Sequence, residues 1–435
     1  MANPCEASTP PAVRSPTVVQ GLQFAIGRRR AMRTWIRRHG RAFELSIPVF
    51  GRTVVVSDPA LTKAVCTARA DQLVNVRPNM SNLFGPGSIF ALDGDRHRAR
   101  RRLLAPAFHG HRLQHHAMVI EEETGRESAR WPDGVEFPIL ESMNRITLNV
   151  ILRAIFGDDA DVDPLRGIVP PFMKRGQLLA FLPAPRAGIR RYSPWRKLDK
   201  LRAAFDLVIG TLIDETEADP LLGERTDIMA MLVSGGITRA EICDEVVTLI
   251  GAGHETTAAA LGWAFERLRR HPAVVAELVD EVDQGGSDLR RATVLELLRI
   301  RTVIDVAGRR VRATDFSLGP WRIPREHTIL LRIADLHEDP AGFAHPDRFD
   351  PSRFRAATSP GSGWLAFGGG ARRCLGAEFA LTEMDIVLRT VLRDFVIQTD
   401  AAPDERSVFQ GVAHIPQHGA RVVLHRRDGA ACPPR

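Results

Sequence analysis

The sequence predicts a mainly helical α+β protein with small peripheral sheets. Long apolar segments at residues 141–156 and 238–270 favour helices, whereas the segments typical of strands are short and scattered. At 1.5 Å per residue the second segment would form a helix about 50 Å long, enough to cross a whole domain. We find no clear linker along the chain, so we expect a single domain over residues 18–427.

The N-terminal part is expected to begin with a Pro-rich tail over residues 1–17 that is disordered or loosely attached. Residues 43–48 and 53–56 flank Phe50-Gly51-Arg52, a pattern typical of a small β-hairpin. Asp58 and Pro59 then provide a cap and a first-turn proline for a helix over 59–68.

The central and C-terminal elements follow from apolar patterning and from caps. The helix at 141–156 is apolar on most faces, which predicts burial. The long helix opens with a capping box, Thr238 to Glu241, and ends before His271-Pro272 because proline terminates helices. Short strands are expected at 328–333, 395–398 and 421–425, followed by a C-terminal tail over 428–435.

Composition and cysteine usage exclude several classes of protein. The five cysteines are odd in number and widely spaced, so neither a disulfide framework nor a structural zinc site is indicated, and they fit a reducing cytoplasm. No secretory signal is visible, and the most apolar stretch, 246–268, carries polar residues in its middle that disfavour a transmembrane span. The net charge of +7 leaves open a nucleic acid, an acidic membrane or an acidic protein partner, or a general preference for arginine.

A glycine-rich loop carries the most specific chemical signal, and its sequence is Phe367-Gly368-Gly369-Gly370-Ala371-Arg372-Arg373-Cys374-Leu375-Gly376. Glycines let a backbone approach a flat ligand closely. A cysteine before a helix and beside two arginines sits where amides and positive charge favour thiolate. In isolation such a loop also fits a buried, inert cysteine.

This loop resembles the haem-binding loop of the cytochrome P450 family, because it matches Phe-x-x-Gly-x-Arg-x-Cys-x-Gly at every fixed position. The resemblance covers nearly the whole chain and implies a soluble, bacterial type of P450 fold with haem b. It implies that Cys374 is the iron ligand and that Phe367, Gly368 and Gly376 border the haem. A thiolate ligand pushes electron density onto haem iron.

A second motif, Ala252-Gly253-His254-Glu255-Thr256-Thr257, interrupts the long helix. Glycine and threonine each cost up to about 1 kcal/mol there relative to alanine, which suggests function, although a kink that only packs is the alternative. The resemblance places this segment beside the haem. It implies that Thr256 takes part in oxygen activation, that Glu255 supplies protons and that Ala252 contacts the cofactor.

Glu296 and Arg299 are expected to form a buried network with Arg348 from Pro346-Asp347-Arg348-Phe349, as in the resembling family. An exposed surface pair is the alternative for an isolated Glu-x-x-Arg. The network is assigned to folding and haem retention, and Arg299 also counts as a candidate cofactor contact. The proline that often follows in the family is absent after Arg299, which leaves the local loop conformation open.

Basic side chains are the expected ligands of the haem propionates. His97 and Arg101 are four residues apart and share a helix face, although a solvated face is the simpler explanation of this basic segment. The resemblance adds Arg372 and Arg309, whose role could pass to Arg310. Arginine suits carboxylates because its guanidinium binds them through two parallel hydrogen bonds.

The predicted function is insertion of one oxygen atom from O2 into a small hydrophobic substrate. The chain carries no flavin or dinucleotide motif, so electrons would come from a ferredoxin or flavodoxin with an NAD(P)H-dependent reductase, docked near Arg372 and Arg373. Alternatives are a peroxide-driven or isomerising haem-thiolate enzyme, or a haem sensor without catalysis. Pocket walls are expected at 75–90, 167–185, 246–252 and 303–306, with Phe84, Phe90 and Phe172 as contacts.

Overall fold

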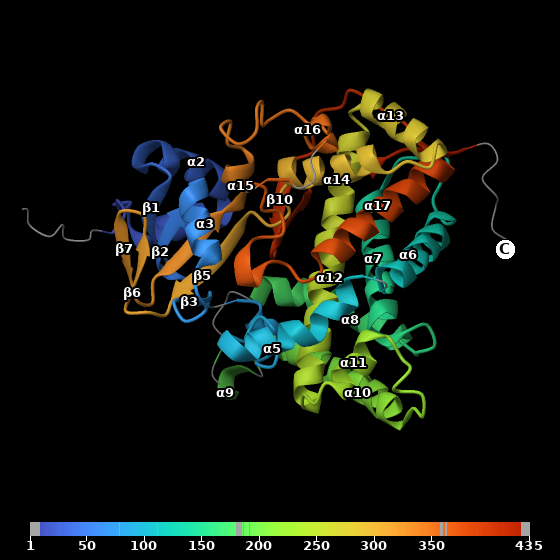
Figure 1. Ribbon diagram of the computed structural model, residues 1–435, viewed down its shortest axis with the longest axis horizontal. Helices are drawn as coiled ribbons and strands as arrows, with labels where there is room; N and C mark the ends of the chain where they lie inside the picture. The colour runs from blue at the N-terminus through green and yellow to red at the C-terminus, as the bar shows by residue number, and fades with distance from the viewer. Residues whose placement is uncertain are drawn as a thin grey trace, which may run out of the picture.

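The structure is a computed structural model that describes residues 9–77, 79–110, 112–179, 185, 187–190, 192–356, 360–361 and 363–427. It has a β-rich part at one end and a larger helical part at the other (Figure 1). The predicted mainly helical α+β architecture is confirmed. The predicted C-terminal tail, residues 1–8 of the N-terminal tail, Cys5 and Cys432 lie outside the described residues.

The helical elements along the chain are α1 (Thr17–Ile26), α2 (Arg28–His39), α3 (Pro59–Thr67), α4 (Ser81–Phe84), α5 (Gly94–Leu104), η1 (Ala105–Phe108), α6 (Arg112–Ser128), α7 (Ile139–Phe156), α8 (Asp163–Leu179), α9 (Ala187–Arg190), α10 (Trp195–Ala218), α11 (Ile228–Ser234), α12 (Arg239–Leu268), α13 (Pro272–Asp283), α14 (Asp288–Ile300), α15 (Ile333–His337), α16 (Ser352–Arg355), η2 (Gly370–Arg372) and α17 (Ala377–Asp394). The strands are β1 (Ala42–Ile47), β2 (Gly51–Val56), β3 (Leu73–Asn75), β4 (Phe137–Pro138), β5 (Val306–Val311), β6 (Asp315–Leu318), β7 (Trp321–Pro324), β8 (Thr328–Arg332), β9 (Phe395–Ile397), β10 (Ser407–Gln410), β11 (Ala413–Pro416), β12 (Arg421–Val422) and β13 (Leu424–Arg426).

The β-rich part is built on a five-stranded sheet of order β1-β2-β8-β5-β3, in which only the β2–β8 pair is parallel among the described strands. Alternation along β2 divides the core in two, because successive side chains point to opposite faces. Val54 and Val56 pack on one face with Val65 of α3, whereas Val55 packs on the other with Trp35 of α2. The predicted hairpin over β1 and β2 is confirmed.

Strand β1 also holds part of the predicted N-terminal tail. The backbone of Val13 donates to Glu44 at 2.9 Å, and the Glu44 amide donates to Pro11 at 3.0 Å. Residues 11–13 are therefore attached to the sheet edge, and the loose tail stays a prediction only for the residues before them.

Helix α12 is the centre of the helical part. Its capping box forms as predicted, with the Thr238 and Glu241 side chains bonded to each other's backbone amides. It packs against the buried helix α7 and against α14 and α17, and Figure 1 shows it running through the middle of the molecule. Most of its residues are buried, because a helix surrounded by others has no solvent face.

One predicted strand was wrong. Residues 421–425 do not form a single strand but two short ones, β12 and β13. Strand β12 pairs with β4, and β13 pairs with β9, so the chain changes partner at Val423. The local sequence carries no signal for this break, because each half is set by a different tertiary neighbour.

Candidate functional site

The cysteine loop is folded tightly between α3 and α17. The Cys374 amide donates to the Phe367 carbonyl at 2.9 Å, which closes the loop into a compact turn. Gly370 has φ of +67°, and a Cβ atom there would lie 1.7 Å from the Cys66 carbonyl oxygen. Only glycine fits this position, since both the left-handed backbone and the close approach exclude a side chain.

Cys374 lies at an open position of the loop. The Cys374 side chain is exposed, although protein atoms surround its sulfur on most sides. Nothing lies within 4 Å of the position that a Cβ would take on Gly376 or on Gly368, whose φ is +66°. Phe367 is half-buried at the start of the loop. A flat group could therefore lie against this backbone.

A backbone amide and nearby arginines favour the Cys374 thiolate, as expected, but burial opposes them. Burial raises the pKa of Cys374, and this outweighs the Gly376 amide and the positive charges of Arg101 and Arg373, which lower it. Arg372 contributes little because its guanidinium turns away, toward Asp93. A metal that coordinates a thiol deprotonates it, so an iron bound to Cys374 would favour the thiolate.

The middle of α12 has an open face. Ala252 is exposed and Thr256 is half-buried, although the helix is otherwise largely buried. They lie one turn apart and share that face. The Thr256 hydroxyl donates to the Ala252 carbonyl at 2.8 Å, and the buried Thr257 hydroxyl donates to Gly253 at 3.1 Å. The interrupted pattern thus marks an opening in the packing, and α12 stays helical through it.

Glu255 lies beside this opening and has a partner that the sequence did not indicate. The Gln177 side-chain amide of α8 donates to the Glu255 carboxylate. Burial raises the pKa of Glu255 to about 7, and the hydrogen bond from Gln177 opposes the rise. A carboxyl group with a pKa near neutrality can both release and take up protons at physiological pH.

Four predicted basic residues gather around one carboxylate. His97 on α5 is buried, and burial followed by the charges of Arg372 and Arg101 lowers its pKa to about 4. Burial also lowers the pKa of Arg372 to about 10, with Arg309 and Arg101 adding to the effect against Asp93. His97 is thus neutral at pH 7, whereas Arg101, Arg309 and Arg372 carry three positive charges.

Asp93 only partly compensates this charge. Arg372 donates to Asp93 and to the Leu92 carbonyl, the latter at 2.6 Å. Arg309 hydrogen-bonds, within the described residues, to its neighbour Gly308 at 2.8 Å. Arg310, the residue after Arg309, points to the other face of β5 and pairs with Glu326 at 2.7 Å. The structure therefore favours Arg309 over Arg310 as a member of this cluster.

The Glu296–Arg299 pair forms as predicted and is completely buried. Arg299 donates to both carboxylate oxygens at 2.7 Å. Its remaining N–H groups donate to the carbonyls of His337, Pro346 and Arg348 at 2.7–3.2 Å. No donor is left for a cofactor, so the expected cofactor contact of Arg299 is corrected to a structural role.

The third member of this network is Arg353, which corrects the prediction of Arg348. The Nε atom of Arg353 lies 3.2 Å from a Glu296 oxygen, whereas Arg348 contributes its backbone carbonyl. The reason is that the one-turn helix α16 packs against α14 and carries Arg353 to Glu296. Where the family often has proline, the Thr302 hydroxyl bonds to the Arg299 carbonyl at 2.9 Å and closes the end of α14.

The phenylalanines predicted to contact a substrate differ in exposure. Phe84 and Phe172 are 2% and 1% exposed, so they belong to the core in this conformation. Phe90 is half-buried, and its ring centre lies 6.0 Å from that of Phe84. A substrate contact with Phe84 or Phe172 would require one of them to move.

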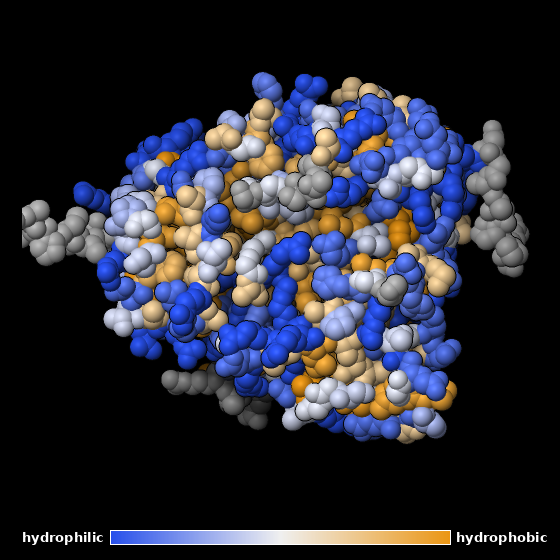
Figure 2. Space-filling view, in the orientation of Figure 1, coloured by the Kyte–Doolittle hydropathy of each residue, from blue (hydrophilic) through white to orange (hydrophobic). Residues whose placement is uncertain are grey.

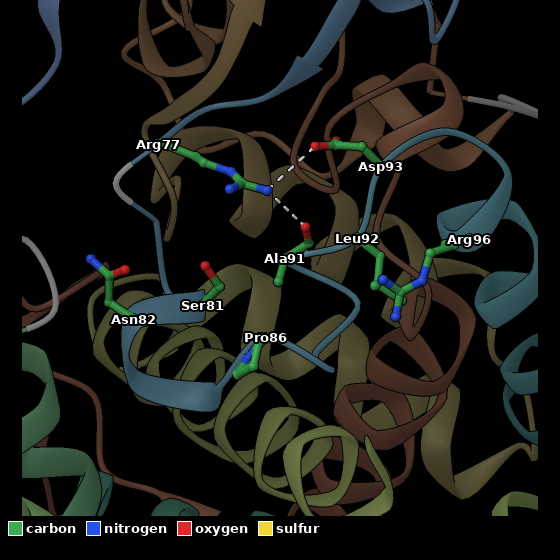
Figure 3. A pocket seen from close by; sticks show the side chains of 8 residues that line it. All are labelled: Arg77, Ser81, Asn82, Pro86, Ala91, Leu92, Asp93 and Arg96. Atoms are coloured by element: carbon green, nitrogen blue, oxygen red, sulfur yellow. Dashed lines mark hydrogen bonds and ion pairs between the residues drawn. The ribbon is translucent and has the colours of Figure 1, made fainter. Parts of the chain in front are cut away.

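A polar pocket of about 480 Å³ lies on the outer side of Asp93 (Figure 3). Arg77 spans it, with a hydrogen bond of 3.0 Å to the Ala91 carbonyl and a distance of 3.7 Å to Asp93. Ser81, Asn82 and Arg96 complete its polar wall. Neither Cys374 nor Thr256 lines it, so it is separate from the open face of α12.

The profile of the cytochrome P450 family matches residues 10–420 of this chain. The chain belongs to the cytochrome P450 family. Cytochrome P450 138 of Mycobacterium tuberculosis is 52% identical over 425 residues, which is 96% of each chain. Cytochrome P450 135B1 of Mycobacterium bovis is 34% identical, over 100% of this chain and 97% of that protein. The chain is thus a haem-thiolate oxidoreductase of the monooxygenase family, of the bacterial type.

Solved P450 structures support the fold. The cyanobacterial CYP120A1, bound to retinoic acid, has a TM-score of 0.86 at 20% identity, covering 97% of this chain and 100% of that one. CYP175A1 from Thermus thermophilus has a TM-score of 0.76 at 23% identity, over 96% and 100%. Within the described part of this P450, no helix combines the length and hydropathy needed to span a membrane.

The residues of this P450 fit a haem on two grounds. The Cys374 side chain is exposed, and the backbone beside it at Gly368 and Gly376 leaves room for a flat group. Arg101, Arg309 and Arg372 carry three positive charges, and Arg77 lies 3.7 Å from the one nearby carboxylate, Asp93. Two haem propionates would balance part of this excess positive charge. His97 is neutral and can donate a hydrogen bond to one of them.

Proposed function

We propose that this P450 inserts one oxygen atom from O2 into a small hydrophobic substrate, using haem b held by Cys374. The supporting observation is that an exposed cysteine on a glycine-rich loop, an open stretch of α12 and an incompletely compensated arginine cluster occur in one protein. The haem supplies the oxidative chemistry when bound, with the thiolate pushing electron density toward the iron.

The cofactor residues of the proposal divide into three groups. Cys374 ligates the metal, and Phe367, Gly368, Gly376 and Ala252 border the ring. His97, Arg101, Arg309 and Arg372 face the propionates. Arg101 also donates to the Arg373 carbonyl at 2.7 Å, so it ties α5 to the cysteine loop.

Thr256 and Glu255 are proposed to control protons. The Thr256 hydroxyl lies on the open face of α12 and can exchange its bond to Ala252 for one to a water or a substrate atom. Glu255 has a pKa of about 7 and can pass protons from the α8 side of the helix. The acid and alcohol together favour O2-dependent oxidation over the peroxide-driven or isomerising alternatives, which do not need a proton relay.

Electrons are proposed to come from a ferredoxin or flavodoxin with an NAD(P)H-dependent reductase, in the cytoplasm. The docking residues are Arg373 and Arg102, and they replace Arg372, whose guanidinium points inward to Asp93. Arg373 is exposed beside Cys374, with Glu378 at 3.6 Å. Arg102 is exposed on α5 and has no carboxylate partner among the described residues. An acidic partner would complement both.

The test is reconstitution of the purified holoprotein with a ferredoxin, its reductase, NADPH and candidate apolar substrates. Product formed in proportion to the NADPH and O2 consumed supports the proposal. Product formed equally well from peroxide without the reductase would favour the peroxide-driven alternative. Ligand-induced spectral shifts without turnover of any substrate would favour a sensor. A spectral screen for ligands that change the haem absorption would first narrow the substrate class.

A further inference from the structure

Helix α1 has an exposed face made of apolar side chains. Val18, Leu22 and Ile26 are 75%, 59% and 80% exposed, and they follow one another at intervals of one turn. Val19 extends the same face. The opposite face carries the buried Phe24 and packs on the sheet. A surface helix normally turns polar side chains outward, so this arrangement suggests that something covers the face.

Helix α2 follows directly and is rich in arginine. Arg29 and Arg33 pair with Glu338, and Arg28 pairs with Asp305. By contrast, the exposed guanidinium groups of Arg30, Arg37 and Arg38 have no acidic partner among the residues that the structure describes. The surface beside the apolar face therefore carries unbalanced positive charge.

A groove joins the two features. It has a volume of about 570 Å³ and runs between residues 12–15 and the helices α1 and α2. Arg14, Arg30, Arg38 and His39 line it, and its described lining contains no acidic residue. Gln23 lines it from the α1 side. Gln23 lies one turn after Val19 and three residues before Ile26, so the groove borders the apolar face directly.

We propose that α1 and α2 form a docking surface for an anionic lipid bilayer. The apolar face of α1 enters the interface between headgroups and acyl chains, and the arginine-lined groove receives the phosphate of a lipid headgroup. An apolar helix face beside basic residues is what an interfacial helix requires. The protein would lie on the membrane without crossing it.

Charge favours an anionic bilayer over two other partners for the surface of α1 and α2. A second copy of the chain would bring two arginine-rich helices together and would leave the groove without anions. An acidic protein would balance the arginines, but it would also need an apolar surface to cover four exposed aliphatic side chains. An anionic bilayer supplies both chemistries in adjacent layers. Its phosphates would bind in the basic groove, and its hydrocarbon would cover the apolar face of α1.

The test is flotation of the holoprotein with vesicles of phosphatidylcholine alone or mixed with phosphatidylglycerol. We expect binding to the mixed vesicles and its loss at high salt. The double variant R30Q/R38Q should bind roughly 30-fold more weakly, about 5-fold for each arginine near an anionic surface. The triple variant V18S/L22S/I26S should bind the mixed vesicles at least about tenfold more weakly, because it buries less hydrocarbon in the bilayer. Unchanged haem absorption confirms that each variant is folded.

Helix α10 provides matched controls. Hydrophobic side chains also gather on the surface over α10 (Figure 2), and Leu207 there is 75% exposed. Arg202 on the same helix is paired with Asp206 and Asp244, and Arg196 is an exposed arginine outside the groove between α1 and α2. We expect L207S and R196Q to bind vesicles as the wild type does.

Four results would overturn the proposal. Flotation of the triple variant like the wild type would remove the apolar face from the interface. Equal binding to neutral and to anionic vesicles would show that the arginines do not contribute to binding. A dimer that the triple variant abolishes, in a protein that binds no vesicle, would assign the face to a second copy. Vesicle binding that appears only after deletion of residues 1–8 would indicate that this segment covers the apolar face of α1 in the full chain.

Discussion

At the scale of single residues, burial sets the protonation of the site more strongly than neighbouring charge does. It raises the pKa of Cys374 despite Arg101 and Arg373, and it raises that of Glu255 to about 7 despite Gln177. It lowers the pKa of His97 to about 4. The site thus holds a thiol whose pKa is raised by burial, an acid with a pKa near neutrality and a neutral imidazole.

Replacing Thr256 with alanine should separate electron consumption from product formation. The variant lacks the hydroxyl on the open face of α12, so we expect NADPH consumption to continue while most reducing equivalents appear as peroxide. Thr256→Ser should restore most of the coupling. Thr257→Ala is the matched control, because that hydroxyl is buried and bonds to its own helix. Product and peroxide per NADPH are measured, and unchanged coupling in Thr256→Ala would contradict the assigned role.

Replacing Gln177 with leucine should raise the pKa of Glu255 further. The amide donates to the carboxylate and lowers its pKa, so its loss favours the protonated acid. If Glu255 delivers protons, the pH at which product yield declines on the alkaline side should move upward by roughly one unit. Gln114→Leu, on the exposed surface of α6, is the control. A profile that stays in place would show that Glu255 is not the titrating group.

The same pKa predicts how stability depends on pH. Because the folded protein raises the pKa of Glu255 from 4.5 to about 7, the folded state binds the proton more tightly. Its contribution to stability is complete below pH 4.5 and is lost as pH rises through 7. Between pH 4.5 and 7, the free energy of unfolding measured with denaturant should fall less steeply in Glu255→Gln than in the wild type. Parallel curves would contradict the raised pKa.

Motifs could predict the residue types of the site but not all of their partners. Cys374, Glu255 and Thr256 stand at fixed places in two short patterns, and the structure presents Cys374 and Thr256 at open positions. Gln177 and Asp93 belong to no such pattern, and only the tertiary fold brings Gln177 to Glu255 and Asp93 to Arg372. The one available signal for Asp93 was its place immediately before a basic helix.

At the scale of elements, the fold depends on a buried charge network that joins α14 to α16. Glu296 accepts from Arg299 and Arg353 and from the amide of Asp350 at 2.9 Å. Helix α14 packs against α12, α17 and α16, so the network anchors the elements that position the cysteine loop. The spacing of Glu296 and Arg299 is local, so the sequence predicted this pair on one helix, but it could not predict the second arginine, Arg353.

Breaking this network should be costly and specific. Arg299→Ala leaves Glu296 buried without its main partner, so we expect a loss of about 3–5 kcal/mol in the free energy of unfolding and weaker haem retention. Arg353→Ala should lose less, about 1–2 kcal/mol, because its guanidinium is partly exposed. Arg348→Ala should stay within about 0.5 kcal/mol, because only its carbonyl takes part. A larger loss in Arg348→Ala than in Arg353→Ala would reverse this assignment.

At the scale of the whole molecule, basic charge is distributed over two separate surfaces. Arg102 and Arg373 lie near the cysteine loop, whereas α2 lies in the β-rich part (Figure 1). The net charge alone could not distinguish an acidic protein from a membrane. Only the fold shows that one basic surface adjoins the thiolate loop and that the other adjoins an apolar helix.

Neutralising the surface near the cysteine loop should slow electron delivery. We expect Arg102→Gln combined with Arg373→Gln to reduce the rate of haem reduction by a ferredoxin about tenfold at low salt, with the difference shrinking at high salt. Arg30→Gln with Arg38→Gln is the matched control on the other basic surface. Stopped-flow reduction under carbon monoxide gives the rate. Equal rates for the wild type and the Arg102/Arg373 variant would place the docking site elsewhere.

The most direct test of the account is the absorption spectrum of the reduced protein under carbon monoxide. We expect the red-shifted Soret band of a thiolate-ligated haem in the wild type, and its loss in Cys374→Ala, with Cys66→Ala and Cys243→Ala unchanged. A wild-type protein without this band, or a Cys374→Ala variant that keeps it, would contradict the assignment of the iron ligand.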